Sequence, residues 1–402
     1  HQEVESRIMD SMDLEKERGI TITAKNTAID YEGVKINIMD TPGHADFGGE
    51  VERSLNLVDG ALLLVDASEG PLPQTRFVLK KTLEKNLPVI LIINKIDRSD
   101  ARIDEVVNEV YDLFIDLDAN DDQIDFPILY TIAKDGIAHE DLNDGSTSLK
   151  PLFNAILNNI EGPIADDSQT PQFLVTNLDY DSYVGQVAIG RLNHGTLSMN
   201  QSYSLCGEDG IRNNQKFSAL YTFKGLDKIQ VEKLEAGDII AVAGIDNVTI
   251  GDTISSNEDP KPLPRILIDE PTVSMLFYVN NGPFAGKEGK YLTSRNISER
   301  LDREILGNVS LQVHKTERTD VFEVRGRGEL QMAVLIETMR REGFELAIAK
   351  PQVIQKEVDG EIHEPYEMIV IDVEEQHQGA IMEEFGPRKA ELKSLEPDGK
   401  GR

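Results

Sequence analysis

The chain has 402 residues, a hydrophobic fraction of 39% and a formal net charge of −31 at pH 7. This length suits two to four domains of roughly 100–200 residues each, and no apolar run reaches the ~18 residues of a membrane helix. The acidic balance argues against a free nucleic-acid binder and against DNA as a partner. The single cysteine, Cys206, excludes an internal disulfide framework. It predicts a cytoplasmic protein, and a monomer is the default expectation.

Residues 26–160 alternate between short apolar runs and amphipathic stretches. Near-continuous apolar strands separated by helices predict a parallel sheet covered on both faces. Ligands of such sheets lie at the carboxyl ends of the strands. The expected strands are 35–39, 61–66, 89–94 and 126–131, and the expected helices are 49–57, 73–86, 102–117 and 149–159.

The pattern changes after residue 163 and a polar linker at 166–171. Short alternating runs with glycine turns at 172–253 predict a small β-barrel. After a second linker at 257–264, the expected order of elements is βαββαβ, the split ferredoxin-like arrangement. Its expected strands are 272–279, 309–314, 321–325 and 345–349, and its helices are 294–306 and 329–342. A further strand at 367–373 and a helix at 379–385 begin a second α+β domain.

The tetrapeptide N-K-I-D at 94–97 follows the apolar run that ends at Ile93. Guanine presents N1–H and an exocyclic amine side by side, and one carboxylate accepts from both, whereas adenine presents an acceptor at N1. We expect Asp97 to accept from guanine, Asn94 to donate to O6 and the Lys95 stem to lie along the base. Such a short motif also recurs by chance, so its neighbours decide the interpretation.

Two upstream segments carry groups that suit phosphate and Mg²⁺. Asp40 ends an apolar run and begins D-T-P-G-H at 40–44. A carboxylate at such a strand end holds Mg²⁺ through its water shell. Gly43 lets its backbone N–H approach a γ-phosphate, because it has no side chain. Thr21 offers a hydroxyl of the kind that ligates Mg²⁺ only while the γ-phosphate is present.

The segment 17–22 together with 40–44 resembles the translational GTPases, the group that includes elongation factors G and Tu. Within that group the chain is most similar to the BipA/TypA family of ribosome-associated GTPases. Four stretches carry this narrower similarity, 12–17, 44–53, 70–77 and 282–290. LepA, a relative with which the family can be confused, resembles the first stretch, diverges at the second and lacks the last.

The resemblance implies a GTPase that hydrolyses GTP to GDP and phosphate on the ribosome, with Mg²⁺ as cofactor. The implied partners are the large subunit and its rRNA, and the implied role is large-subunit assembly and stress-related translation. By the same resemblance His44 orients the attacking water, and Ile20 is an apolar gate that restrains His44. Asp46 and Glu50 suit a helix-capping or solvated role.

A second contribution to base binding is expected after the fourth strand. Thr131-Ile132-Ala133-Lys134 stands where the family usually carries Ser-Ala-x. Ala133 is expected to offer its backbone N–H to guanine O6, with Lys134 beside it. Ile132 departs from the family pattern, in which serine supports this loop.

The resemblance divides the chain into four units. Residues 1–163 are a GTP-binding domain without its N-terminal part, 168–258 a β-barrel like domain II, 266–352 a ferredoxin-like domain III, and 363–402 part of a domain similar to domain V. Arg325 and Arg327 beside the second helix of domain III are either surface arginines or rRNA contacts.

One part of the family pattern is absent, because G-x-x-x-x-G-K-[ST] does not occur in the chain. The G-x-x-x-G-K sequence at 282–287 is a decoy, with the wrong spacing and glutamate after its lysine. We therefore expect an internal fragment that lacks the phosphate loop, its first strand and the C-terminal region. The charge-assisted bonds of that loop contribute about 1.5–3 kcal/mol each, so this fragment is expected to be a poor GTPase. The alternatives are a non-hydrolysing ribosome-binding module or a LepA-like translation factor.

Overall fold

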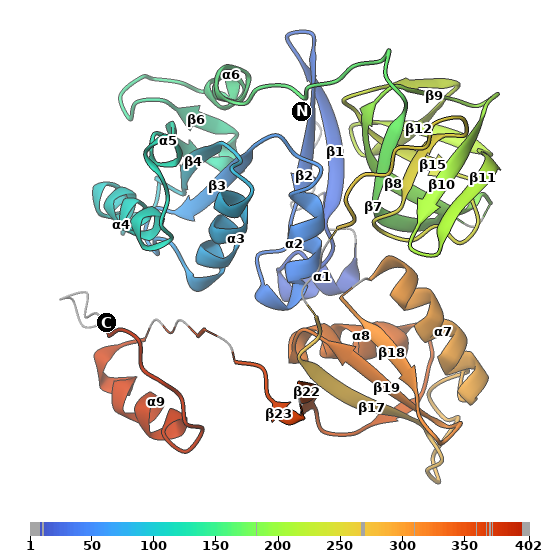
Figure 1. Ribbon diagram of the computed structural model, residues 1–402. Coiled ribbons are helices and arrows are strands. Elements are labelled where there is room, and N and C mark those ends of the chain that lie inside the picture. Colours follow the sequence, from blue (N-terminus) through green and yellow to red (C-terminus); the bar gives the residue numbers. More distant parts are fainter. Residues whose placement is uncertain are drawn as a thin grey trace.

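The computed structural model describes residues 9, 12–181, 183–266, 270–308, 310–358, 360–366, 368–369, 371 and 373–395. An α/β domain comes first, followed by a curled antiparallel sheet, an α+β domain and a C-terminal extension (Figure 1). This order confirms the expected fold class. The expected strand at 367–373 lies partly outside the described residues. Within the described ranges, no helix combines the length and the apolar character that crossing a membrane requires.

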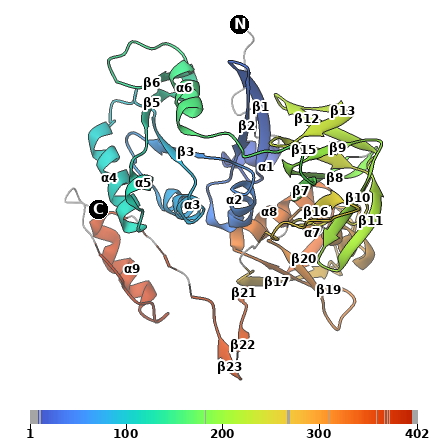
Figure 2. The ribbon, with the colours of Figure 1, turned by 45° about the horizontal axis from the view of Figure 1, so that its top comes forward.

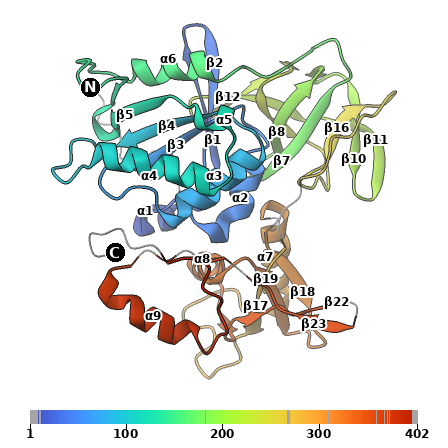
Figure 3. The same cartoon turned by 60° about the vertical axis from the view of Figure 1, so that its left-hand side comes forward.

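The first domain is built on a four-stranded sheet with the order β3-β4-β5-β6. The first three strands are parallel, and β6 returns antiparallel to β5. Helices α3 and α4 cover one face and α6 the other (Figure 3). The strands are β3 (Ala61–Asp66), β4 (Val89–Asn94), β5 (Ile128–Ile132) and β6 (Ile137–His139). The helices are α3 (Pro73–Glu84), α4 (Ile103–Asp116), α5 (Asp121–Ile124) and α6 (Lys150–Asn159), with the 3₁₀ turn η2 (Ala133–Asp135) after β5.

Strand β4 is the centre of this domain, and its residues 89–93 are all buried. Leu91 and Ile93 face α3 and α4, whereas Ile90 and Ile92 face α6. A strand buried on both faces needs apolar side chains at every position, which is why this strand could be read directly from the sequence. Its carboxyl end carries Asn94 into the loop where the candidate site lies.

The prediction that residues 35–39 belong to the parallel sheet is wrong. Strand β2 (Val34–Asp40) pairs with β1 (Lys25–Tyr31) in a separate antiparallel hairpin. Glu32 and Gly33 form its two-residue turn with φ of +50° and +82°, the backbone of a type I′ turn. The hairpin stands between the first domain and the curled sheet (Figure 1).

The hairpin lies against the curled sheet because one of its faces finds polar and apolar partners there. Lys35 Nζ contacts both carboxylate oxygens of Asp238, at 2.8 and 2.7 Å, and Asn37 Nδ2 donates to Asp238 at 3.1 Å. Ala28 and Met39 pack against apolar side chains of the same sheet. Lys35, Asn37 and Met39 are two residues apart and therefore lie on one face of β2, and this face meets the curled sheet mainly through polar contacts.

The curled sheet of the second domain has eight antiparallel strands in the order β11-β10-β16-β7-β8-β15-β12-β13. A further pair, β9 and β14, completes the domain. Cys206 is buried in it, as expected. The strands are β7 (Gln172–Asp181), β8 (Gly185–His194), β9 (Thr196–Ser198), β10 (Ser202–Gly207), β11 (Gly210–Lys216), β12 (Ala219–Lys224), β13 (Asp227–Val231), β14 (Lys233–Glu235), β15 (Ile239–Ala243) and β16 (Thr253–Ser256).

The third domain has an antiparallel sheet in the order β18-β19-β17-β20, with β21 also paired to β17. Together with its two helices this is the split βαββαβ arrangement. The helices pack on the sheet through a core that includes Phe277, Leu301 and Met332. The elements are β17 (Val273–Val279), α7 (Ser294–Gly307), β18 (Gln312–Lys315), β19 (Val321–Gly326), α8 (Glu329–Arg341), β20 (Leu346–Ile348) and β21 (Gln352–Val353).

The C-terminal extension leaves the third domain as a short hairpin and then a helix (Figure 2). Its elements are β22 (Lys356–Val358), β23 (Glu361–His363), the 3₁₀ turn η3 (Glu375–His377) and α9 (Gln378–Phe385). Helix α9 matches the expected helix at 379–385. The two strands are exposed throughout, and α9 contains no buried residue.

Three short elements join the domains: α1 (Asp13–Arg18), the 3₁₀ turn η1 (Ala45–Phe47) and α2 (Gly48–Ser54). Glu17 of α1 forms an ion pair with Arg341 at the end of α8. Arg53 of α2 is buried and donates to the Gly307 carbonyl at 3.1 Å. Because η1 and α2 follow the D-T-P-G-H segment directly, the contact of Arg53 with Gly307 holds the end of that segment near the third domain.

Candidate functional site

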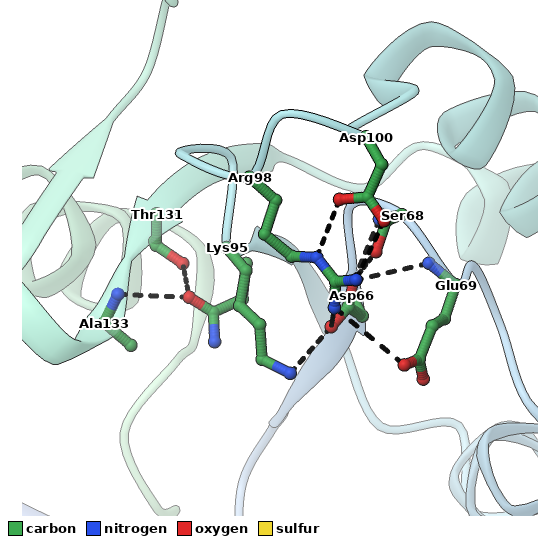
Figure 4. A network of polar contacts seen from close by, with 9 residues as sticks. Asp66, Ser68, Glu69, Lys95, Arg98, Asp100, Thr131 and Ala133 are labelled. Carbon is green, nitrogen blue, oxygen red and sulfur yellow. Dashed lines mark hydrogen bonds and ion pairs between the residues drawn. The ribbon is translucent and has the colours of Figure 1, made fainter.

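Asn94 organises the loop that follows the neighbouring strand. Its Oδ1 accepts the Thr131 hydroxyl at 3.0 Å and the Ala133 N–H at 3.1 Å (Figure 4). Asn94 and Thr131 are partners in the parallel register of β4 and β5, so the two side chains leave the sheet at the same level. The amide of Asn94 therefore fixes the Ala133-Lys134 backbone relative to β4.

Lys95 turns the chain sharply at the end of β4 and reaches the next strand. Its φ is +62°, a left-handed conformation that is uncommon for a residue other than glycine. Its Nζ lies 2.7 Å from Asp66 Oδ2 at the end of β3, and Arg98 Nη1 lies 3.7 Å from the same oxygen (Figure 4). The strand ends of β3 and β4 are thus tied by charge.

The Asp66 carboxylate is stabilised in its ionised form. Burial alone would raise its pKa, but the Lys95 ammonium and the N–H and hydroxyl of Ser68 hold that pKa well below its usual range. Ser68 donates from its backbone at 2.9 Å and from Oγ at 2.8 Å. Asp66 therefore anchors Lys95 rather than exchanging protons near neutral pH.

Asp97 lies beside Lys134, with Lys134 Nζ 2.9 Å from Asp97 Oδ2. This hydrogen bond lowers the pKa of the exposed Asp97 carboxyl. Asp97 is then an anionic acceptor at neutral pH, and the Lys134 ammonium occupies one of its oxygens. Asn94, Lys95, Asp97, Ala133 and Lys134 are brought together at the carboxyl ends of β4 and β5.

Two features of this group differ from what the sequence predicts. The Ala133 N–H, expected to be offered to guanine O6, donates to Asn94 Oδ1 instead. The support expected from a serine at Ile132 comes instead from the neighbouring hydroxyl of Thr131, which is 2% exposed. The signal was present, because Thr131 and Asn94 end adjacent parallel strands. Asp66 was also missed, although it ends the strand on the other side of β4.

The remaining candidates form a second group around the segment between β2 and α2. His44 Nδ1 accepts the Asp46 N–H at 3.2 Å, and the His44 ring meets Phe47 edge-on at 6.2 Å between centroids. Ile20 is partly buried against the cluster that contains Phe47 and Val334. Gly43 directly precedes His44, and an added Cβ there would meet nothing within 4 Å.

Asp40 and Thr21 belong to this second group by their place in the chain. Asp40 is the last residue of β2, and Thr21 follows α1 by three residues. The sequence predicts that Asp40 and Asn94 share one edge of the parallel sheet. This prediction is wrong, because β2 lies outside that sheet. Among the described residues, no cluster of three or more His, Cys, Asp or Glu side chains is arranged to hold a metal ion.

The acidic residues that follow the D-T-P-G-H segment, and the two arginines before α8, have partners within the protein. Asp46 caps α8 of the third domain, and Glu50 accepts the Ala24 N–H at 3.2 Å and pairs with Arg53. Asp46 fits the capping role that the sequence suggests, although it caps a helix of another domain. Glu50 is neither a helix cap nor solvated, because it is largely buried between the Ala24 N–H and Arg53. Arg325 pairs with Glu323, and Arg327 lies 3.9 Å from Glu52 of α2. Arg327 is thus an interdomain contact.

Comparisons with known proteins agree with this architecture. The model of the elongation factor Tu GTP-binding domain matches residues 1–162, and the model of elongation factor G domain 2 matches residues 171–257. A crystal structure of a Thermus thermophilus protein superposes with a TM-score of 0.63 at 18% identity, covering 88% of this chain and 65% of that one. A GTP-binding domain followed by that second domain defines the class of translational GTPases.

Relatives with high identity narrow the class. Proteins named "Large ribosomal subunit assembly factor BipA" are 52% identical in Salmonella typhimurium and in Escherichia coli K12, and 49% identical in Bacillus subtilis. The matches cover 100% of this chain and 66% of each of these relatives. The chain belongs to the BipA family of translational GTPases.

Proposed function

We propose that the Asn94 group binds the base of GTP and GDP. The observation that carries this proposal is that an ionised Asp97, bonded to Lys134, lies in the same loop region as an Asn94 whose amide is held by Thr131 and Ala133. The carboxylate accepts from N1–H and the amine of guanine when Lys134 moves aside. Adenine offers an acceptor at N1 and is rejected.

The second group supplies the phosphate-facing chemistry in this proposal. Thr21 and Asp40 offer hard oxygen donors that suit Mg²⁺, which keeps several waters and needs few protein ligands. When bound, Mg²⁺ neutralises charge on the phosphate oxygens. His44 orients the attacking water, Gly43 gives its N–H to the γ-phosphate, and Ile20 restrains His44 through the apolar cluster that it shares with Phe47.

We also propose that the protein to which this chain belongs hydrolyses GTP on the ribosome and assists assembly of the large subunit. The support is the name of the relatives at about 50% identity, large ribosomal subunit assembly factor BipA. Large-subunit rRNA is the proposed partner and the cytoplasm the proposed location. Stress-related translation remains part of the proposed role through the family resemblance.

A second candidate is a ribosome-binding module that does not hydrolyse GTP. It is favoured by one observation: the strand that carries Asp40 is separate from the sheet that carries Asn94. In that arrangement the two groups do not share the sheet edge at which a G domain binds its nucleotide.

Titration of the chain with a fluorescent GTP analogue, with the ATP analogue as control, tests the nucleotide proposal. Selective binding of the guanine analogue that is lost in Asp97→Ala supports it. Equal binding of both analogues would contradict the base assignment. Co-sedimentation of the chain with large ribosomal subunits, with and without GTP, tests the ribosome proposal separately.

A further inference from the structure

The loop of residues 282–290, between β17 and α7, has a role that the nucleotide site does not explain. The loop projects from the third domain after the end of β17, on the lower edge in Figure 1. Its G-x-x-x-G-K sequence resembles a phosphate loop without its spacing. In the structure the loop is wrapped around a carboxylate of its own domain.

Glu345 holds the backbone of this loop. Its carboxylate accepts N–H groups from Gly286 at 2.8 Å, Glu288 at 2.7 Å and Gly289 at 2.5 Å. These donors lower the pKa of Glu345, with the Gly286 N–H contributing most. Because the N–H groups are already used, they do not serve a nucleotide phosphate, in agreement with the sequence interpretation of a decoy.

The wrapping depends on two glycines. Gly286 has a φ of +84°, which other residues adopt only with strain. A Cβ on Gly289 would lie 2.7 Å from the Gly343 carbonyl oxygen. The Lys290 N–H also donates to that carbonyl, at 2.7 Å. The loop is therefore a defined scaffold at the C-terminal end of α8.

This scaffold presents an aromatic ring to solvent. Phe284 is 71% exposed, and Lys287 Nζ lies 4.6 Å from the centroid of its ring. The ammonium covers one face of the ring through a cation–π contact. Tyr291, 41% exposed, follows directly after the loop.

The loop also carries two exposed lysines, Lys287 and Lys290, in a chain of net charge −31. Its own carboxylate is Glu288, and the Glu345 carboxylate inside the loop is already held by backbone N–H groups. The nearby Arg295 is paired with Glu299 at 2.7 Å, so the two lysines are the cations that the loop itself offers. An exposed ring beside lysines on a rigid loop is the combination that binds unpaired nucleotides, since any base offers a face for stacking and lysines meet the phosphates.

We propose that the 282–290 loop is an RNA-contact element. Phe284 stacks on one unpaired base with the ring face that Lys287 does not cover, and Lys287 and Lys290 neutralise the neighbouring phosphates. A protein partner would bury a broader apolar surface than one ring. The inference rests on the proposed function only for the source of the RNA, which is the ribosomal particle.

Fluorescence anisotropy with a short labelled single-stranded RNA at low salt tests the contact directly. Phe284→Ala is expected to weaken binding by about 5- to 150-fold, the range for stacking of one base. Phe284→Tyr keeps a ring and is expected to restore binding. The matched control is Tyr183→Ala, which removes an aromatic ring that is 95% exposed in the second domain.

The contribution of the two lysines is measured by the salt dependence of RNA affinity. Lys287→Ala and Lys290→Ala are each expected to reduce the slope of log affinity against log salt by about 0.7, the value for one phosphate contact on a single strand. A change in folding alone would not alter that slope. Equal RNA binding by wild type, Phe284→Ala and Tyr183→Ala would overturn the proposal, as would the absence of RNA binding by the wild-type chain.

A photo-crosslinking benzoylphenylalanine placed at position 284 distinguishes RNA from protein on ribosomal particles. Crosslinks to rRNA support the proposal, and crosslinks confined to ribosomal proteins overturn it. The proposed function fails separately if the wild-type chain does not co-sediment with large subunits while Phe284→Ala still reduces binding to free RNA.

Discussion

The Asp46 carboxylate caps a helix of another domain, since Asp46 Oδ2 accepts the N–H of Leu330 in α8, 284 positions further along the chain, at 2.9 Å. The same oxygen accepts the Gln331 N–H at 3.3 Å. A carboxylate at a helix N-terminus is favoured by the exposed N–H groups and by the helix dipole. Because Asp46 also donates its backbone N–H to His44, the position of the candidate catalytic loop is coupled to the third domain.

Gly328 leaves the space that this contact requires. Its φ of −167° is extended backbone that any residue adopts, but an added Cβ would lie 2.3 Å from Asp46 Oδ2. Gly328→Ala is expected to destabilise the chain by about 1–3 kcal/mol through overpacking. The measurement is the urea unfolding midpoint followed by circular dichroism, and Gly162→Ala, in a loop with open space around it, is the control.

A double-mutant cycle shows whether Asp46 is the cause. Asp46→Ala alone is expected to cost about 0.5–2 kcal/mol, as for other lost helix caps. In the Asp46→Ala background, Gly328→Ala is expected to cost less than in wild type, because the carboxylate that it meets is gone. Strictly additive effects would show that Gly328 acts through other neighbours.

Thr131→Val tests the support of Asn94. Valine fills the same space but removes the hydroxyl that donates to Asn94 Oδ1, and one such bond contributes about 0.5–1.5 kcal/mol. Affinity for a fluorescent GTP analogue is expected to fall by about 2- to 10-fold, and Thr131→Ser is expected to retain it. Thr82→Val removes another buried hydroxyl of the same domain, bonded to the Val78 carbonyl, and should leave affinity unchanged.

Asp97→Asn is expected to move base preference from guanine towards xanthine. The amide no longer accepts from both N1–H and the guanine amine, and it can donate to the second carbonyl of xanthine. Loss of two charge-assisted bonds corresponds to about 10²-fold or more in the affinity for GTP. Competition between GTP and xanthosine triphosphate measures the change. Asp121→Asn, at an exposed position, serves as control, and an unchanged preference in Asp97→Asn would refute the guanine assignment.

The ion pair of Lys95 with Asp66 predicts a pH dependence of stability. The folded-state pKa of Asp66 is lowered, so its ionised form stabilises the fold above the unfolded-state pKa of about 3.9. This contribution is lost as pH falls through the folded-state value. The stability difference between wild type and Asp66→Asn should therefore be largest near neutral pH and shrink below about pH 4. Asp209→Asn, at an exposed turn, should show no such convergence.

Much of the first and third domains can be predicted from local pattern. Strands β3 and β4 begin and end at the predicted residues, because runs of apolar side chains bounded by Gly, Pro or polar residues define strands buried on both faces. The order of elements in the third domain follows from the alternation of periods of two and 3.6 residues. The N-K-I-D tetrapeptide at 94–97 and the D-T-P-G-H segment are likewise visible as residue types at defined strand ends.

Contacts between distant segments are the part that the sequence did not predict. Strand β2 pairs with β1, and its Lys35 contacts Asp238 of the second domain. These contacts place Asp40 outside the parallel sheet. Periodicity shows which face of a strand is packed but does not name the surface that it packs against. The Glu32-Gly33 turn was the local signal for the hairpin, and no local signal marks the partner sheet.

The sequence by itself determined the family, the strands that end in Asn94 and Asp66, and the residue types that suit a guanine base. Each of these depends on side chains within a few positions of one another. Only the tertiary structure decided that Thr131 supports Asn94, that Asp46 caps α8 and that Glu345 holds the 282–290 loop. In those contacts a polar group finds its donor on another element, and long-range packing alone determines which element lies within hydrogen-bond distance.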